Sequence, residues 1–181
     1  MRAWGWHRLD EAWAERIVSE AGVRPGDLVL DIGAGKGALT RHLVDAGARV
    51  LAIELHPGRA EFLRRRFATA DVKVVEIDAC RELLLPHKPF KVVANPPYTI
   101  SSTLVRSLTA RDSRLVRADL VLQKAFARKT AEGTRGRWQA MVGMSVPRQA
   151  FQPHPRVDSA VLVLRPRSLS VSQWSARRKS L

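Results

Sequence analysis

The residues best suited to chemistry are Asn95, Pro96, Pro97 and Tyr98, which follow the apolar run Val92–Ala94. The Asn95 side-chain oxygen and the Pro96 backbone carbonyl are hydrogen-bond acceptors, and Tyr98 offers an aromatic face. An amine on an aromatic ring is a poor nucleophile, and acceptors for its two N–H groups favour the pyramidal geometry from which it attacks. The prolines fix the backbone and preorganise these acceptors. The tetrapeptide predicts group transfer to a planar nitrogen, with Tyr98 stacked on its ring, although Asn-Pro is also common in plain turns.

A glycine-rich segment runs from Asp31 to Gly37, between an expected strand and an expected helix. Glycines permit a tight turn and let a ligand approach the backbone closely. Glu54 ends the next expected strand, 21 residues after Gly33, where a carboxylate can accept the hydroxyls of a ribose. We therefore expect Gly33, Gly35 and Glu54 to bind a cofactor that contains adenosine. The loop alone leaves NAD open, because Gly33, Gly35 and Ala38 also satisfy the dinucleotide spacing.

Asp78 follows the third expected strand, where its carboxylate could accept a hydrogen bond from an adenine amino group. A lone acid after a strand is also a common cap or turn residue. Together with the tetrapeptide at Asn95, Asp78 favours S-adenosylmethionine over NAD. The sulfonium of that cofactor is an activated methyl donor, so we expect no metal, and positioning should supply most of the acceleration.

An adenine paired in a helix cannot reach such a site, so the target base must be single-stranded, looped or flipped out. The segment 151–159 is interrupted by prolines and carries an arginine, as a loop beside a base would. We expect Phe151 to lie at the rim of the site and to stack on the base opposite Tyr98. The alternative is that Phe151 is an ordinary core aromatic before a strand.

Hydrophobic patterning indicates the elements that position these residues. Strands and helices alternate, which favours right-handed crossovers and a mostly parallel sheet. We expect a doubly wound, Rossmann-like α/β fold with a seven-stranded sheet and helices on both faces. The expected strands are 28–32, 49–54, 72–76, 90–94, 118–122, 141–146 and 159–164, the last two as a hairpin, and the expected helices are 11–21, 38–46, 57–67 and 101–110.

Length and composition indicate one domain over residues 1–167, with an N-terminal arm over 1–10 and a basic, flexible tail over 168–181. The 31 basic and 17 acidic residues are unevenly divided: the first 99 residues hold 15 and 13, a net charge of +2, and the rest hold 16 and 4, a net charge of +12. This asymmetry favours a nucleic acid partner. No apolar run is long enough for a membrane span, and the single cysteine, Cys80, fits a reducing compartment. We expect a cytoplasmic monomer.

Five blocks of the chain, taken in order, resemble the Erm family of ribosomal RNA adenine N6-methyltransferases and the related adenine dimethylases of small-subunit rRNA. The resemblance implies a class I methyltransferase fold, with Gly33, Glu54, Asp78 and Asn95 at S-adenosylmethionine. It also implies that Asn95, Tyr98 and Phe151 handle an adenine of 23S rRNA, in the region where macrolides bind. The blocks are the segments 31–40, 95–98, 122–127 and 151–159, and the pair Glu54 and Asp78.

Two departures from the family pattern affect these expectations. Family members usually open with a Gln-Asn-Phe-Leu-like motif that closes over the cofactor, whereas this chain has Gly5-Trp6-His7-Arg8-Leu9, so no cofactor contact is assigned to Trp6 or His7. The family also usually carries a small helical C-terminal domain, for which we expect no room after residue 167. We therefore expect 23S rRNA methylation that gives macrolide, lincosamide and streptogramin B resistance. The alternatives are a 16S rRNA dimethylase, a DNA adenine or protein glutamine methyltransferase, and a non-catalytic rRNA-binding assembly factor.

Overall fold

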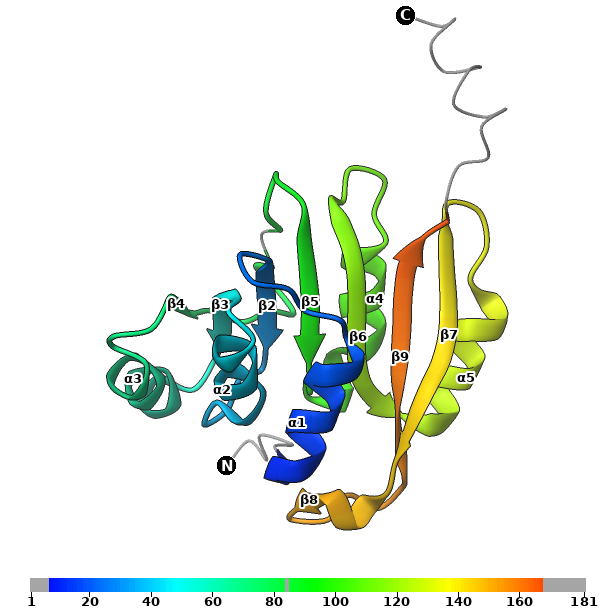
Figure 1. The fold of residues 1–181 in the computed structure, drawn as a ribbon. Helices are drawn as coiled ribbons and strands as arrows, with labels where there is room; N and C mark the ends of the chain where they lie inside the picture. Colours follow the sequence, from blue (N-terminus) through cyan, green and yellow to red (C-terminus); the bar gives the residue numbers. More distant parts are fainter. Residues whose placement is uncertain (1–6, 84, 168–181) are drawn as a thin grey trace, which may run out of the picture.

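The structure is a computed structural model that describes residues 7–83 and 85–167. Seven of its strands form one sheet in the order β4-β3-β2-β5-β6-β9-β7 (Figure 1). The strands β4 to β6 in this order are parallel, whereas β9 is antiparallel to both β6 and β7. The expected mostly parallel, seven-stranded sheet is confirmed. The strand bounds are β2 Leu28–Ile32, β3 Arg49–Glu54, β4 Val72–Glu76, β5 Phe90–Ala94, β6 Leu115–Gln123, β7 Trp138–Val146 and β9 Ser159–Pro166.

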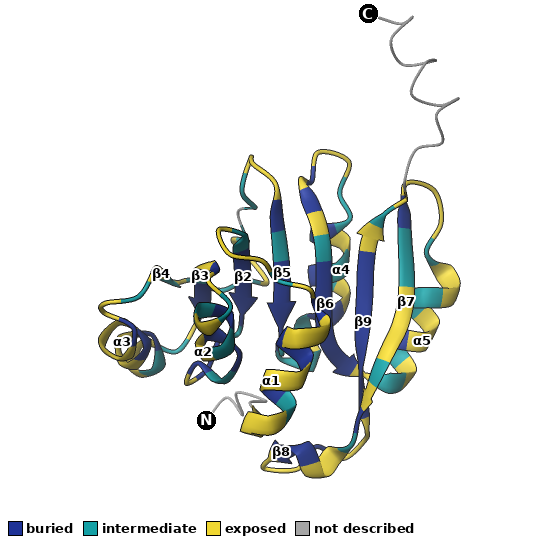
Figure 2. Ribbon diagram, in the orientation of Figure 1, coloured by how far each residue is buried: buried dark blue, intermediate teal, exposed yellow. Residues whose placement is uncertain are grey.

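Helices cover both faces of the sheet, which confirms the doubly wound arrangement. In Figure 1, α1 and α2 lie in front of the sheet and α4 and α5 lie behind it. Each face has its own hydrophobic core, one formed with Ile17, Leu43 and Leu63, the other with Leu104 and Leu108. The central strands between the cores are buried along most of their length (Figure 2). The helix bounds are α1 Glu11–Glu20, α2 Ala38–Asp45, α3 Pro57–Arg66, α4 Ser101–Leu108 and α5 Lys124–Gly133.

Local sequence signals explain where the helices begin. The Asp10 carboxylate caps α1 by accepting a hydrogen bond from the Ala12 backbone N–H at 3.0 Å. Pro57 occupies the start of α3, where its missing N–H costs nothing. Gly37 precedes α2 with a φ of 82°, a left-handed conformation that favours glycine.

The order of the strands places the site. The chain runs outward from β2 to β4 and then returns to β5, which lies on the other side of β2. At such a switch in strand order, the connections leave in opposite directions and open a crevice at the carboxyl ends of the strands. The glycine loop follows β2 and the segment Asn95–Tyr98 follows β5, so the two expected functional segments meet at this crevice.

The structure also contains elements that the sequence pattern did not indicate. Helix α5 was not expected, and β6 begins at Leu115, three residues before the expected start. A separate two-stranded sheet pairs β1 (Arg8–Leu9) with β8 (Phe151–Gln152). The expectations for most of the N-terminal arm and for the tail after residue 167 lie outside the described residues.

Candidate cofactor and base site

Gly33 joins the glycine loop to the turn at Asn95–Tyr98. It has a φ of 78°, and a Cβ atom on it would lie 3.1 Å from Pro97 Cδ and 3.4 Å from Pro96 Cα. A side chain at this position would therefore strain the backbone and press on the proline turn. Pro96 is buried in this contact. The glycine and the two prolines form a single packed unit, in which each segment fixes the position of the other.

Glu54 ends β3 and is only 4% exposed. Its Oε2 atom accepts the Gly35 backbone N–H at 2.8 Å, and its Oε1 atom accepts the His56 N–H at 2.8 Å. Arg59 pairs with the same Oε1 atom at 3.2 Å. Because a carboxylate offers about four acceptor positions, Oε2 retains capacity for a ligand hydroxyl. The glycine loop thus contacts Glu54 through Gly35. Glu54 is the acid that was expected, from its spacing in the sequence, to bind the ribose.

Asp78 serves as a turn residue and also lines a cleft. Its Oδ1 atom accepts the Cys80 N–H at 2.9 Å, and its Oδ2 atom lies 3.6 Å from Arg81 Nε. The cleft beside it has mainly apolar walls and includes Glu54 at one end. Its lining consists of Gly33, Ile53, Glu54, Leu55, Arg59, Ile77, Asp78, Ala79, Pro97 and Ile100.

A second cleft opens on the other side of the glycine loop. Gly33 lines both clefts, so a ligand that crosses the loop at Gly33 could occupy both. This second cleft is more polar, and the first described residues of the chain, His7 to Leu9, form part of its wall. Its lining consists of His7, Arg8, Leu9, Glu11, Asp31, Gly33, Ala34, Lys36, Ala38, Leu39, Phe62, Arg66 and Asn95.

Asp31 is a buried acid at the second cleft. It is 1% exposed, and its Oδ2 atom accepts the Thr40 hydroxyl at 2.6 Å. Burial raises the pKa of the Asp31 carboxyl to about 7, and the nearby charge of Glu54 contributes to the increase. The cleft therefore contains a carboxyl group that gains or loses its charge near neutral pH.

Asn95 is oriented by the N-terminal arm. Its Nδ2 atom donates to the backbone carbonyl of His7 at 2.9 Å. With the amide nitrogen held there, Oδ1 points the other way, and no hydrogen bond from a residue in the described ranges is recorded to it. The side chain thus keeps a free acceptor at the crevice.

Tyr98, the only tyrosine of the chain, is held from two sides. Its hydroxyl lies 2.6 Å from the hydroxyl of Ser159, the first residue of β9, which is fully buried. The His7 ring stacks on the Tyr98 ring, with the ring centroids 5.9 Å apart and the planes at 27°. Burial raises the pKa of the Tyr98 phenol, so the ring stays neutral at physiological pH.

Phe151 does not lie where it was expected. It is 2% exposed and packs in the core cluster that contains Leu9 and Val161. Its backbone pairs with Leu9 through β1 and β8, and this pairing covers the ring. The expected rim position is wrong, because the N-terminal arm, which the sequence pattern did not place, closes over this side chain.

Two residues at the site were not anticipated from the sequence alone. His7 contacts both Asn95 and Tyr98, and Ser159 anchors the Tyr98 hydroxyl. Ser159 belongs to the segment 151–159, one of the blocks that resemble the family, so the sequence did contain a signal for this residue. No signal pointed to His7, because its contacts depend on a pairing of residues more than 140 positions apart.

The sheet order, the glycine loop after β2, the acid that ends β3 and the acid that follows β4 define a class I methyltransferase fold, whose members take S-adenosylmethionine as methyl donor. A profile of the family described as "Ribosomal RNA adenine dimethylase" matches residues 9–178, and the chain belongs to this family. It is therefore an enzyme of the rRNA adenine methyltransferase family, and its cofactor is S-adenosylmethionine.

The curated relatives are named as methyltransferases of small-subunit ribosomal RNA. The chain is 37% identical over 183 residues to "Ribosomal RNA small subunit methyltransferase A" of Thermosynechococcus vestitus, with 91% of this chain and 69% of that protein covered. It is 36% identical to the protein of that name in Nitratidesulfovibrio vulgaris, with 88% and 66% covered. The chain thus spans about two thirds of the length of these relatives.

Solved structures of other methyltransferases superpose on this chain. The 23S rRNA methyltransferase ErmE superposes with a TM-score of 0.78 at 31% identity, covering 96% of this chain and 76% of that chain. A dimethyladenosine transferase from Plasmodium falciparum superposes with a TM-score of 0.75 at 26% identity, covering 96% and 67%. A putative RNA methyltransferase from Pyrococcus horikoshii, at 17% identity and a TM-score of 0.65, shares the fold.

The described residues also bear on metal sites and on membrane spans. In residues 7–83 and 85–167, no group of three or more histidine, cysteine, aspartate or glutamate side chains is arranged to hold a metal ion. None of the helices in the described ranges combines the length and apolar character needed to cross a bilayer.

Proposed function

We propose that the chain methylates the N6 amino group of an adenine in ribosomal RNA. The observation that carries this proposal is the orientation of Asn95 beside Tyr98. The amide nitrogen donates to the His7 carbonyl, which leaves Oδ1 as an acceptor next to an aromatic ring. An exocyclic amine on a stacked base needs these two features together.

The residues of the two clefts fit S-adenosylmethionine. Glu54 Oε2, with spare acceptor capacity beside Gly35, would take the ribose hydroxyls. Asp78 would accept from the adenine amino group of the cofactor, between apolar walls that include Ile77 and Pro97. The second cleft, with Asp31 and Asn95 in its lining, would take the positively charged methionine end.

The chain's own groups act on the target base by position. When bound, S-adenosylmethionine supplies a methyl group that is already activated on a sulfonium. Asn95 Oδ1 and the Pro96 carbonyl accept hydrogen bonds from the two N–H groups of the amine, which favours a pyramidal nitrogen with a localised lone pair. Tyr98, held by Ser159, stacks on the base and aims the amine. The preorganised acceptors then account for most of the catalytic effect.

Two ribosomal RNAs are candidate substrates. The names of the curated relatives at 36–37% identity favour 16S rRNA of the small subunit. The likeness to ErmE, at 31% identity over 96% of this chain, favours 23S rRNA as the second candidate. Methylation of 23S rRNA in the macrolide-binding region would protect ribosomes from macrolides, lincosamides and streptogramin B.

Methyl transfer to separated rRNAs tests both candidates. Purified full-length protein is incubated with tritiated S-adenosylmethionine and with 16S rRNA, 23S rRNA, or the assembled small and large subunits, and the labelled nucleotide is mapped by primer extension. Label at an adenine of one rRNA supports the proposal and identifies the substrate. Label in DNA or protein, with none in either rRNA, would overturn it. Expression in a sensitive host should raise macrolide resistance only if 23S rRNA is labelled.

A further inference from the structure

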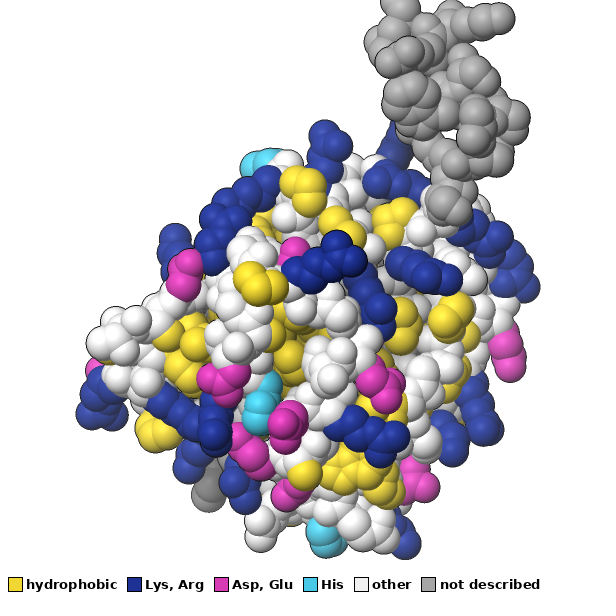
Figure 3. Space-filling model, in the orientation of Figure 1, with side chains coloured by type: hydrophobic (Ala, Val, Ile, Leu, Met, Phe, Trp, Pro, Cys, Tyr) yellow, Lys and Arg dark blue, Asp and Glu magenta, His cyan; other side chains and the backbone are white. Residues whose placement is uncertain are grey.

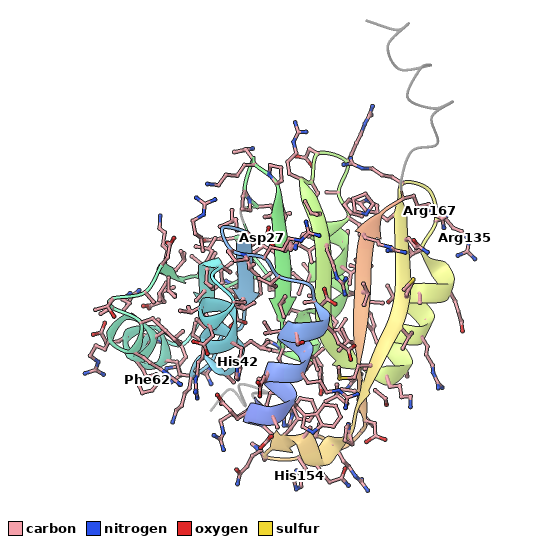
Figure 4. The ribbon with its side chains drawn as sticks, in the orientation of Figure 1. Asp27, His42, Phe62, Arg135, His154 and Arg167 are labelled. Atoms are coloured by element: carbon pink, nitrogen blue, oxygen red, sulfur yellow. The ribbon has the colours of Figure 1, made fainter. Side chains whose placement is uncertain are left out.

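A third cleft lies beside the N-terminal arm, on the outer side of the short sheet that β1 forms with β8. Its volume is about 250 Å³. Because pockets for drug-sized ligands typically have about 300–1,000 Å³, this cleft suits a single ring system. Figure 4 shows its place through His154, at the end of the molecule that β8 forms. The polar part of its lining consists of Arg8, Asp10, Gln149, Gln152 and His154.

The pairing of β1 with β8 turns two of these side chains outward. Leu9 lies opposite Phe151, and both are buried, with exposed fractions of 3% and 2%. Side chains alternate between the two faces of a sheet, so the other pair, Arg8 and Gln152, lies on the opposite face, where both residues are exposed. Arg8 Nη2 donates to Gln152 Oε1 at 3.2 Å, and this contact orients the guanidinium in the wall of the cleft.

The cleft offers hydrogen-bonding groups of both kinds. The Arg8 guanidinium keeps N–H groups besides the one that bonds Gln152. The Asp10 carboxylate caps α1 through Oδ1, and no residue in the described ranges donates to its Oδ2 atom. His154 Nδ1 lies 2.6 Å from the Phe151 carbonyl, which can only accept, so Nδ1 carries the hydrogen and Nε2 of the neutral ring is an acceptor. A ligand here must therefore both accept and donate.

A nucleobase meets this requirement better than a phosphate does. A phosphate only accepts hydrogen bonds, and its charge would be repelled by Asp10. Guanine presents the adjacent acceptors O6 and N7, which match the fork of an arginine, and the adjacent donors N1–H and N2–H, which match a carboxylate. Among the four bases of RNA, guanine alone has both a pair of adjacent acceptors and a pair of adjacent donors.

We propose that this cleft binds a guanine of the RNA, in a nucleotide next to the target adenine, and that Arg8 and Asp10 select it. The inference rests on the proposed function, because it takes the adenine to lie at Asn95. Arg8 lines both this cleft and the one that contains Asn95. The carbonyl of the preceding residue, His7, accepts the Asn95 amide at 2.9 Å. An RNA strand whose adenine reaches Asn95 therefore passes this cleft.

Binding of short RNAs tests the inference. The full-length protein is titrated, by fluorescence anisotropy, with labelled single strands that hold one adenine among uridines, and with strands in which either neighbour of the adenine is guanine, cytosine or adenine. A good bidentate contact discriminates between bases by about 5- to 150-fold, so guanine at one of the two positions should tighten binding at least about fivefold. Inosine, which lacks the N2 amino group, and 7-deazaguanine, which lacks N7, should each lose most of this gain.

Two conservative variants remove the selecting groups and keep the fold. Asp10→Asn retains a side chain that caps α1 but replaces a carboxylate oxygen with an N–H donor. Arg8→Lys retains the charge but lacks the fork of the guanidinium. Both should lose the preference for guanine, while the affinity for the uridine strand stays within about threefold of wild type. Arg106→Lys, at an exposed position of α4, is the matched control and should keep the preference.

The outcomes separate this inference from the proposed function. Equal binding of the guanine and uridine strands by wild type, or a preference for another base, would overturn the inference. A preference that survives in Arg8→Lys or in Asp10→Asn would also overturn it, as would an equal loss of affinity for every strand in Arg8→Lys, which would indicate a phosphate contact. Circular dichroism and cofactor binding verify that each variant is folded. Absence of rRNA methylation by wild type would contradict the proposed function, while the titrations would still decide whether the cleft selects guanine.

Discussion

Burial raises the pKa values of two residues at this site, Asp31 and Tyr98. Tyr98 keeps its proton and shares a hydrogen bond with Ser159, so its ring remains neutral. Asp31 is fully enclosed beside Glu54, and its pKa is raised to about 7. The neutral ring of Tyr98 thus follows β5, and the acid that titrates near neutrality, Asp31, lies in the neighbouring strand β2.

The stability of the fold should depend on the charge of Asp31. Between about pH 4 and pH 7 the folded state retains a proton that the unfolded state has released, so the free energy of unfolding falls as pH rises through this window. Between pH 5 and pH 8 the fall should be about 2–3 kcal/mol, and it should level off above about pH 7. Urea unfolding at pH 5 and pH 8 measures it.

Asp31→Asn removes this titration and should reduce the difference in stability between pH 5 and pH 8. The exposed Asp71 provides a matched control, since Asp71→Asn should leave the difference unchanged. An undiminished difference in the Asp31→Asn variant would rule out Asp31 as its source.

At the scale of elements, the junction between the glycine loop and α2 depends on Gly37. A Cβ atom at Gly37 would lie 2.6 Å from a ring carbon of Phe67 and 3.0 Å from Leu63 Cδ2, and its φ is 82°. Gly37→Ala should therefore destabilise the fold by about 1–3 kcal/mol through backbone strain and overpacking. Thermal unfolding of the variant measures the loss.

Gly133, the last residue of α5, is the matched control for Gly37. A Cβ atom there meets nothing within 4 Å, so Gly133→Ala should be neutral or stabilising by up to about 1 kcal/mol. Equal effects of the two substitutions would contradict the packing that is described around the glycine loop.

The elements differ in how far their sequences could predict them. The strands β2 and β5 have the expected bounds, because each is mostly apolar and mostly buried, with a single charged residue in each. Helix α5 was not expected; Ala127 is its only buried residue, and four of its ten residues are charged. The pairing of β1 with β8 was missed because two-residue strands have no period to read, and this pairing is what encloses Phe151.

In the candidate site too, some residues could be predicted from the sequence and others could not. Gly33, Gly35, Glu54 and Asp78 gather as expected because their positions follow from local loops at the ends of neighbouring parallel strands. Contacts between distant segments, such as His7 with Tyr98, could not be inferred from spacing.

At the scale of the whole molecule, arginine and lysine side chains are widely distributed over the face shown in Figure 3. Arg135 and Arg167 lie at the end of the sheet opposite His154 (Figure 4), and both donate to backbone carbonyls. Arg148 and Arg156 are exposed at the carboxyl edge, beside the proposed base site. The two ends of the molecule therefore both present positive charge to an RNA.

RNA binding should depend on salt, and mainly through the carboxyl edge. Removing two phosphate contacts lowers the slope of log K against log salt by about 1.4 to 1.8. We expect this change for Arg148→Gln combined with Arg156→Gln, and a smaller change for the control pair Arg135→Gln and Arg167→Gln. Fluorescence anisotropy with a labelled rRNA fragment measures both slopes. A larger change in the control pair would place the RNA on the opposite edge.

The central claim is that Asn95 presents an acceptor to an adenine amine of ribosomal RNA. Mass spectrometry of the nucleosides from rRNA incubated with S-adenosylmethionine and either wild type or Asn95→Ala tests it most directly. The account predicts N6-methylated adenosine with wild type and none with Asn95→Ala, while the variant binds the cofactor within roughly tenfold of wild type. A methyl group on another nucleoside, or wild-type levels of N6-methylated adenosine with Asn95→Ala, would contradict it.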